Sequence, residues 1–301
     1  MLTPYVVDFE TEAIDESHPH LAPKPVGVAI RYLDGKCKYY AWGHPWGNDS
    51  SYEIAKSELQ KVWDSDEQVL FHNAKFDLGV AYKWFGLPKL DKFRIEDTLF
   101  LLFLKYPHSK SLSLKPASQE ILGMPPDERD AVADWLRNYR IIATTQAPGA
   151  FICRAPGSIV RPYAIGDVDR TFRLWEKITP QLDDREREAY DRERRLLPIL
   201  MENEAQGMRV DLGGLEQAKK TYTLAVCATD VWLRTKLGVP GLNLDSDKEV
   251  AAALKKSGVV SKFKPTPTGL DSVSKKNSRL DPSPIWLLRP YRRLPSGKKF
   301  R

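Results

Sequence analysis

The sequence predicts an α/β protein whose sheet opens with three consecutive strands. Asp34 and Gly35 stand between two β-rich runs, and an Asp-Gly pair in that position is a strong hairpin signal. Another β-rich run, Tyr5–Val7, precedes them, so we expect an antiparallel meander. Helical periodicity then alternates with further short β-rich runs, which indicates helices packed against a sheet.

The first elements follow in the order βββαβ. Ile54, Leu59 and Val62 have the spacing of one apolar helix face, and the run that ends at Phe71 is rich in strand-forming residues. The expected elements are strands over 5–7, 25–32 and 36–42, a helix over 52–63 and a strand over 67–71.

The opening strand ends in two carboxylates, Asp8 and Glu10. Residues two apart on a strand leave the same face, and like charges held that close repel each other. A fold that keeps both usually has a cation between them, most naturally Mg²⁺ or Mn²⁺ with oxygen ligands. Acidic pairs are also common at strand ends, so a solvated rim is the alternative interpretation of this motif alone.

Composition describes a soluble globular protein with the length of two domains. Hydrophobic residues make up 42% and charged residues 29% of the 301 residues. The longest purely apolar run, Leu99–Leu104, is too short to cross a bilayer, and Asp8 and Glu10 stand where a signal peptide would be apolar. We therefore expect a cytoplasmic protein with no membrane partner.

The thiols and the first histidines carry little functional signal. Cys37, Cys153 and Cys227 are odd in number and have no CxxC spacing, so neither a disulfide framework nor a zinc site is expected. His18 and His20 form an HxH pair, but no third ligand stands nearby in their loop.

The net charge of +6 is unevenly distributed. Residues 251–301 contain thirteen Lys or Arg and two Asp, a net charge of +11, which leaves −5 for residues 1–250. A basic segment of this kind suits a polyanion such as nucleic acid. A solvated terminal run is the equally weighted alternative.

A third carboxylate follows the strand that ends at Phe71. Asn73 stands where a helix N-cap belongs, and Asp77 falls one turn later on the same side of the predicted helix. The motif could equally be an ordinary cap followed by a surface carboxylate.

The middle of the chain is predicted to be mainly helical and shows no chemistry by itself. Asp97 is expected to cap an apolar helix that follows a short strand. The expected elements are a strand and helix within 93–106, helices over 112–122 and 130–139, and an irregular connection over 143–162 with three prolines.

The last candidate motif lies on a predicted helix that begins at Tyr163. Tyr163 and Asp167 are four residues apart and therefore face the same way, while apolar residues such as Trp175 can bury the other side. A phenol beside a carboxylate can position a water molecule. The alternative is a helix whose Tyr packs and whose Asp is solvated.

The three motifs in this order resemble those of the DnaQ-like (DEDD) 3′→5′ proofreading exonucleases, in the subclass with tyrosine. They read Asp8-Phe9-Glu10, then Asn73 to Asp77, then Tyr163 to Asp167. The resemblance covers about residues 1–181. It implies an RNase H-like fold, a mixed five-stranded sheet flanked by helices in the order βββαβαβα.

The remaining residues, 182–301, resemble the opening part of the thumb of a family A DNA polymerase. A charged helix leads to Gly207, and Val210 and Asp211 match the short turn that follows it. We find no counterpart of the polymerase palm or fingers motifs, so we expect no templated synthesis from this chain alone. A natural short protein, half of a split polymerase and an expressed fragment all remain open, and a separately encoded polymerase part is one candidate partner in a bacterial or phage-infected cell.

The resemblance implies a mechanism and a set of site residues. Two divalent cations, Mg²⁺ or Mn²⁺, would be held by Asp8, Glu10, Asp77 and Asp167, and Tyr163 would orient the attacking water. The substrate implied is DNA, as a single-stranded 3′ end or a primer–template duplex. The candidates for holding the terminal nucleotide are Phe9, Thr11, Asn73 and Phe76.

Two other functions use the same observations. An RNase D-like exoribonuclease would use the same carboxylates to degrade RNA, and only the thumb-like region argues for DNA. A catalytically inactive scaffold that binds nucleic acid is the second, and the presence of all four carboxylates argues against it.

Overall fold

The computed structural model describes residues 3–18, 21–125, 127–143 and 148–260, together with residues 263, 271 and 273. The chain forms two compact units, Met1–Gly207 and Met208–Arg301. The predicted functional division after residue 181 stays a prediction, and the boundary between the compact units lies after Gly207. Most of the basic segment over 255–301 lies outside the described residues.

A mixed five-stranded sheet forms the centre of the first unit, as the sequence predicts. The strand order is β3-β2-β1-β4-β5, in which β1 pairs antiparallel with β2 and parallel with β4. β2 pairs antiparallel with β3, and β4 pairs parallel with β5. The strands are β1 Tyr5–Thr11, β2 Pro25–Arg31, β3 Cys37–Ala41, β4 Val69–Phe71 and β5 Ile95–Asp97.

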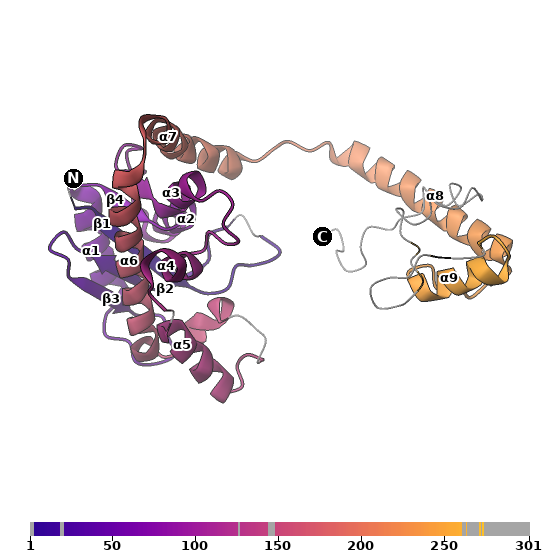
Figure 1. Cartoon of the computed structure of the whole chain (residues 1–301), viewed down its shortest axis with the longest axis horizontal. Helices are drawn as coiled ribbons and strands as arrows, with labels where there is room; N and C mark the ends of the chain where they lie inside the picture. Colours follow the sequence, from indigo (N-terminus) through magenta and orange to yellow (C-terminus); the bar gives the residue numbers. More distant parts are fainter. Residues whose placement is uncertain are drawn as a thin grey trace. The chain divides into compact units, whose positions relative to one another are not determined.

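Helices cover both faces of this sheet. Figure 1 shows the long helix α6 lying across the sheet, and its residues contact β1, β2, β3 and β4. The helices of this unit are α1 Tyr52–Asp64, α2 Ala74–Phe85, α3 Thr98–Lys105, α4 Leu114–Leu122, α5 Asp127–Asn138, α6 Gly157–Ile178 and α7 Asp184–Gln206, with short 3₁₀ helices at Gly149–Arg154 and Thr179–Gln181.

The central strand β1 divides its side chains between two cores. Val7 and Phe9 pack on the face shared with α1 and α2, whereas Val6 packs on the opposite face, against residues of α6. Side chains alternate along a strand, so Asp8 and Glu10 fall on the same face as Val6. The alternation therefore directs both carboxylates toward α6.

Helix α6 begins earlier than the sequence predicts. The irregular connection expected over 143–162 is wrong for its last part, because α6 starts at Gly157 and contains Pro162. The start is held by tertiary contacts, since the Gly157 N–H donates to the Trp46 carbonyl at 2.9 Å. A Cβ atom at Gly157 would lie 2.8 Å from the Gly47 carbonyl oxygen, so only glycine allows this close approach.

A buried polar network attaches α7 to the sheet. Glu96 of β5 is 5% exposed and accepts hydrogen bonds from the Tyr190 hydroxyl at 2.7 Å and from Arg194 at 2.5 Å. The Tyr190 hydroxyl also accepts from the Asp97 N–H at 2.9 Å. Burial raises the pKa of Glu96 and the charge of Arg194 opposes that rise. These contacts explain why α7 belongs to the first compact unit.

The second unit is helical over its described residues, as predicted. It contains α8 Leu212–Leu237 and α9 Asp247–Lys256. Asp211 caps α8 by accepting from the Gly214 N–H, and α8 ends at Gly238, which has the left-handed conformation. Among the described residues, no helix combines the length and the apolar composition that crossing a membrane requires.

The network around Glu96 generates a stability prediction. Arg194→Met removes one partner of a buried ion pair and leaves the Glu96 carboxylate without its cation, so we expect the free energy of unfolding to fall by about 3 kcal/mol. Chemical denaturation monitored by circular dichroism measures this change. Arg192→Met is the matched control, because Arg192 belongs to an exposed ion pair and its loss should change stability by less than about 0.5 kcal/mol. Equal effects of the two substitutions would show that the network contributes nothing specific.

Candidate active site

Three of the predicted carboxylates meet between β1 and α6. Asp8 and Glu10 come from β1, and Asp167 comes from the middle of α6. Each offers an oxygen, and these ligand atoms all lie within 4.8 Å of one another. Side-chain alternation on β1 and the packing of α6 across the sheet together produce this acidic cluster, defined here as Asp8, Glu10 and Asp167.

The fourth predicted carboxylate, Asp77, lies beside this cluster. It belongs to the first turn of α2, is 2% exposed, and its Oδ1 accepts the Phe9 N–H at 3.0 Å. Burial raises the pKa of Asp77 well above its ordinary range, and the charge of Asp8 adds to that rise. Because the charge of Asp8 acts on Asp77 and the charge of Asp77 acts on Glu10, all four carboxylates belong to one electrostatic site.

Burial and mutual repulsion make the ionised cluster unfavourable without a cation. Burial raises the pKa of Asp8 to about 7, and the charge of Asp167 adds to the effect. The pKa of Glu10 is raised well above its ordinary value, first by burial and then by Asp8. The Glu10 Oε1 atom is buried and has no hydrogen-bond partner among the described residues. Oxygen donors of this kind, including an unpartnered buried one, fit a hard divalent cation such as Mg²⁺ or Mn²⁺.

The turn before α2 is held by Asp97 rather than by Asn73. Asn73 occupies the predicted N-cap position in the left-handed conformation, with φ 71°, but its side chain makes no cap hydrogen bond. The Asp97 carboxylate accepts instead from the N–H groups of Asn73 at 2.9 Å and Ala74 at 2.8 Å, and from its own helix at the Leu99 N–H. The predicted N-cap position of Asn73 is therefore confirmed, but a carboxylate from the neighbouring parallel strand, not the Asn73 side chain, bonds the first amides.

His72 lies next to this turn and is held neutral. Burial lowers its pKa to about 4, and the charge of Lys115 contributes to the lowering. Thr98 donates its hydroxyl proton to the Phe71 carbonyl, so the 2.8 Å contact between Thr98 Oγ1 and His72 Nδ1 requires the proton on Nδ1. No sequence motif predicts a role for this histidine.

Lys115 is a buried cation at the site, and no sequence motif predicted it. It comes from α4, is 8% exposed, and its Nζ lies 2.6 and 2.5 Å from the two carboxylate oxygens of Asp167. The same Nζ lies 3.7 Å from the centre of the Tyr163 ring. A single lysine in a helix that follows a Ser-rich segment carries no signal of this contact, which depends on how α4 packs against α6.

The residues predicted to hold a nucleotide separate into two pairs. Phe9 is 4% exposed, and its ring packs in the core 5.5 Å from the Phe85 ring. The Thr11 hydroxyl donates to the Glu12 carbonyl. Asn73 and Phe76, in contrast, line an open groove of about 1060 Å³. Among the described residues, the second pair therefore lines a groove that a ligand can enter.

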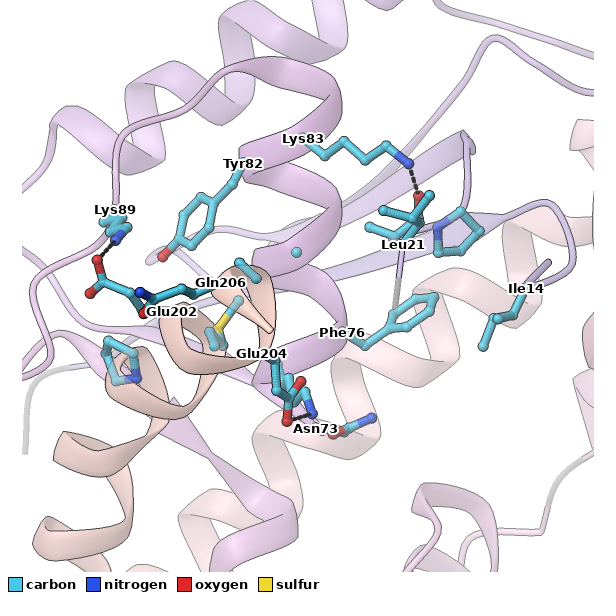
Figure 2. Close-up of a pocket in the computed structure, with 17 residues that line it drawn as sticks. Ile14, Leu21, Asn73, Phe76, Tyr82, Lys83, Lys89, Glu202, Glu204 and Gln206 are labelled. Carbon is cyan, nitrogen blue, oxygen red and sulfur yellow. Dashed lines mark hydrogen bonds and ion pairs between the residues drawn. The ribbon is translucent and has the colours of Figure 1, made fainter. Parts of the chain in front are cut away.

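This groove lies between α2, the β1–β2 loop and the end of α7. Figure 2 shows Tyr82 projecting from α2 on the side of Glu202 of α7, and Phe76 projecting from α2 toward Leu21 and Ile14 of the loop. Lys75, Lys83 and Lys89 supply positive charge; two of them form ion pairs, Lys75 with Glu204 at 2.6 Å and Lys89 with Glu202 at 3.5 Å. An apolar wall edged with lysines suits bases and phosphates together.

Sequence comparison shows the family of the first unit. A family model described as "3'-5' exonuclease" matches residues 7–183, more than half of the chain. Two relatives named DNA polymerase DpoZ are 27% identical over 215 residues in Salmonella phage PMBT28 and 40% identical over 75 residues in Vibrio phage phiVC8. The aligned part is 68% and 25% of this chain. It spans 31% and 12% of the relatives, so the chain is similar to less than a third of each.

One solved structure supports the fold. The POL domain of Pol1 from M. smegmatis, in complex with DNA primer-template and dNTP, aligns with 93% of this chain and 41% of its own, with a TM-score of 0.57 and 19% identity. Brucella melitensis NrnC with bound Mg²⁺ aligns with 70% of this chain and 90% of its own, with a TM-score of 0.46 and 18% identity.

The raised pKa values generate a prediction for the metal-free protein. Asp8 has a pKa of about 7 in the folded state and an ordinary value of 3.8, so the folded state binds more protons between these values. Stability linked to this group is therefore present at low pH and is lost as the pH rises through 7. We expect the melting temperature in EDTA to fall between pH 5 and pH 8, as measured by scanning calorimetry.

Two controls accompany this measurement. Asp8→Asn removes the titrating group and should flatten the fall, and Mn²⁺ should raise the melting temperature more at pH 8 than at pH 5, because protons compete with the metal for the same oxygens. A melting temperature in EDTA that rises from pH 5 to pH 8 would contradict the electrostatic account of the cluster.

Proposed function

Because the chain belongs to the 3′-5′ exonuclease family, we propose that it removes nucleotides from the 3′ end of a DNA strand and releases nucleoside 5′-monophosphates. The observation that carries this proposal is the convergence of Asp8, Glu10 and Asp167 beside Asp77. Carboxylates that are buried or half-buried and brought together from three elements are costly to maintain, and they are suited to binding the divalent cations that phosphodiester hydrolysis uses.

The four carboxylates would hold two divalent cations, Mg²⁺ or Mn²⁺. In this proposal Asp8 and Glu10 contribute to the site near the attacking water, and Asp77 serves mainly the second ion. When bound, the ions supply activation of water and stabilisation of the charge on the departing 3′ oxygen. Phe9 contributes through its backbone, because its N–H holds the Asp77 carboxylate in one orientation.

Tyr163 is proposed to orient the attacking water. Its helix places it one turn from Asp167, on the same side of α6, and Lys115 contacts both residues. A tyrosine hydroxyl can donate a hydrogen bond to a water molecule. In this role the hydroxyl positions the nucleophile without taking its proton.

The groove beside Asn73 and Phe76 is the proposed path of the single strand. Stacking of bases on aromatic rings and contacts between lysines and phosphates are the common means of binding single strands without sequence preference. Phe76 and Tyr82 supply rings, and Lys83 and Lys75, the latter after exchange of Glu204 for a phosphate, would supply charge in the same groove. We propose that Asn73, which is exposed and in a left-handed conformation, contacts the strand close to the cluster.

The chain is proposed to act as the proofreading part of a family A DNA polymerase, with residues 1–181 as the exonuclease domain and 182–301 as a thumb-like region. The relatives named DNA polymerase support this reading, although the aligned part is less than a third of each. Helix α7 falls in the second region by sequence resemblance and packs with the first through Tyr190 and Arg194. In this proposal the chain alone does not add nucleotides to a primer.

The central test is a degradation assay on matched single strands of DNA and RNA. We expect shortening from the 3′ end with Mg²⁺ or Mn²⁺, no product in EDTA, and preference for DNA. Asp8→Ala and Asp167→Ala should each lower the rate by at least ~10²-fold, because each removes a metal ligand. Asp64→Ala, which removes an exposed carboxylate from α1, is the control and should leave the rate unchanged. Full activity of a folded Asp8→Ala protein would contradict the proposed metal site. Faster degradation of RNA than of DNA would mean that RNA, not DNA, is the substrate.

A second test concerns the phenol. Tyr163→Phe keeps the ring and removes the hydroxyl, so the rate at saturating substrate should fall less than after loss of a carboxylate, while KM changes little. Steady-state kinetics on a single-stranded oligonucleotide measure both constants. A loss equal to that of Asp167→Ala, with metal affinity intact, would mean that the hydroxyl takes part more directly than by orienting water.

A further inference from the structure

Lys115 places a full positive charge among carboxylates that are expected to bind metal. Its Nζ contacts both oxygens of Asp167, at 2.6 and 2.5 Å, and both side chains are less than a tenth exposed. A buried ammonium is unfavourable unless it is paired, and a buried carboxylate has the same requirement. The pair therefore satisfies both groups while no other cation is bound.

The charge of Lys115 acts on the whole site. It opposes the rise in pKa that burial causes at Asp8 and at Glu10, and it lowers the pKa of His72. Arg170, also on α6, lies farther from Asp167, with 3.8 Å between its Nη1 and the Asp167 Oδ1. Among the described residues, Lys115 is thus the cation that lies nearest to the Asp167 carboxylate.

We propose that Lys115 is a positioning residue that acts as an internal counter-cation: it holds Asp167 toward Asp8 and Glu10 without metal, and it competes with the metal for the Asp167 oxygens. This inference rests on the proposed function, because it takes Asp167 to be a metal ligand. It adds a residue that sets the metal affinity of the site without contacting the reacting atoms.

The competition follows from the contact geometry. With Nζ against both Asp167 oxygens, a metal ion can use this carboxylate fully only after the ammonium withdraws. The lysine side chain has a flexible four-carbon stem, so it can move without moving α4. The Tyr163 ring can retain the ammonium through a cation–π contact after it leaves Asp167, because the centre of the ring already lies 3.7 Å from Nζ.

The test compares the Mn²⁺ affinity of the full chain with that of Lys115→Met, by isothermal titration calorimetry at pH 8.5. Removing the competing charge should tighten Mn²⁺ binding by at least about fivefold, a small part of the Coulomb interaction between an ammonium and a divalent ion at this range. Lys115→Arg keeps the charge and should stay within about twofold of the unaltered chain. Lys105→Met is the matched control, because Lys105 pairs with Glu186 outside the cluster, and it should not change Mn²⁺ affinity.

Thermal melting gives an independent readout. In EDTA, Lys115→Met should melt at a lower temperature than the unaltered chain, because the carboxylates lose their internal cation. Saturating Mn²⁺ should remove most of that difference. Lys105→Met should show the same melting difference with and without Mn²⁺.

The outcomes separate this inference from the proposed function. Mn²⁺ binding to Lys115→Met that is unchanged or weaker would overturn the inference. If Lys115→Met does not fold, Lys115→Gln replaces it with the same expectation, since an amide can donate a hydrogen bond to Asp167 without charge. If Asp167→Asn binds Mn²⁺ as tightly as the unaltered chain, Asp167 is no ligand and the proposed metal site itself fails.

Discussion

Repulsion among buried and half-buried carboxylates is the constraint on which the first unit depends. Asp8, Glu10 and Asp167 lie within one small volume, and Asp77 lies beside them. An ionised group in such a place is unfavourable by several kcal/mol unless a cation or hydrogen bonds compensate it. The surrounding structure compensates two of these carboxylates. The Phe9 N–H donates a hydrogen bond to Asp77, and Lys115 forms an ion pair with Asp167. What remains uncompensated, including the Glu10 Oε1 atom, is the part that a divalent cation would satisfy.

The sheet fixes these groups because β1 is buried on both faces. Val7 and Phe9 are held in the core beneath α1 and α2, so the alternate residues Asp8 and Glu10 have to face α6. A shift of register by one residue would put both carboxylates into an apolar core and Phe9 against α6, which makes the correct register strongly preferred. The apolar core beneath α1 and α2 and the acidic cluster thus lie on opposite faces of one strand. The strand order places that strand in the middle of the sheet.

Sequence patterns predicted what depends on spacing and missed what depends on packing between elements. The period of two on β1 and the four-residue spacing of Tyr163 and Asp167 are local, and the order of the strands along the chain and most helices were predicted from such signals. Asp97 was predicted to cap its own helix, but its bonds to the amides before α2 depend on the pairing of β4 with β5. The contact between Lys115 and Asp167 and the start of α6 at Gly157 likewise arise from packing that no single segment encodes.

One short strand connects the site with α7. Glu96 and Asp97 are adjacent on β5, where Glu96 is bound by Tyr190 and Arg194 of α7, and the Asp97 carboxylate holds the first amides of α2. Tyr190 contacts both residues, because its hydroxyl donates to Glu96 and accepts the Asp97 N–H. A displacement of α7 would therefore disturb the residue that orients the turn carrying Asn73, and with it the first turn of α2 that carries Asp77. The groove and the acidic cluster both depend on this strand, so the position of α7 affects the geometry of the site. This holds although α7 lies beyond the residues that carry the exonuclease motifs.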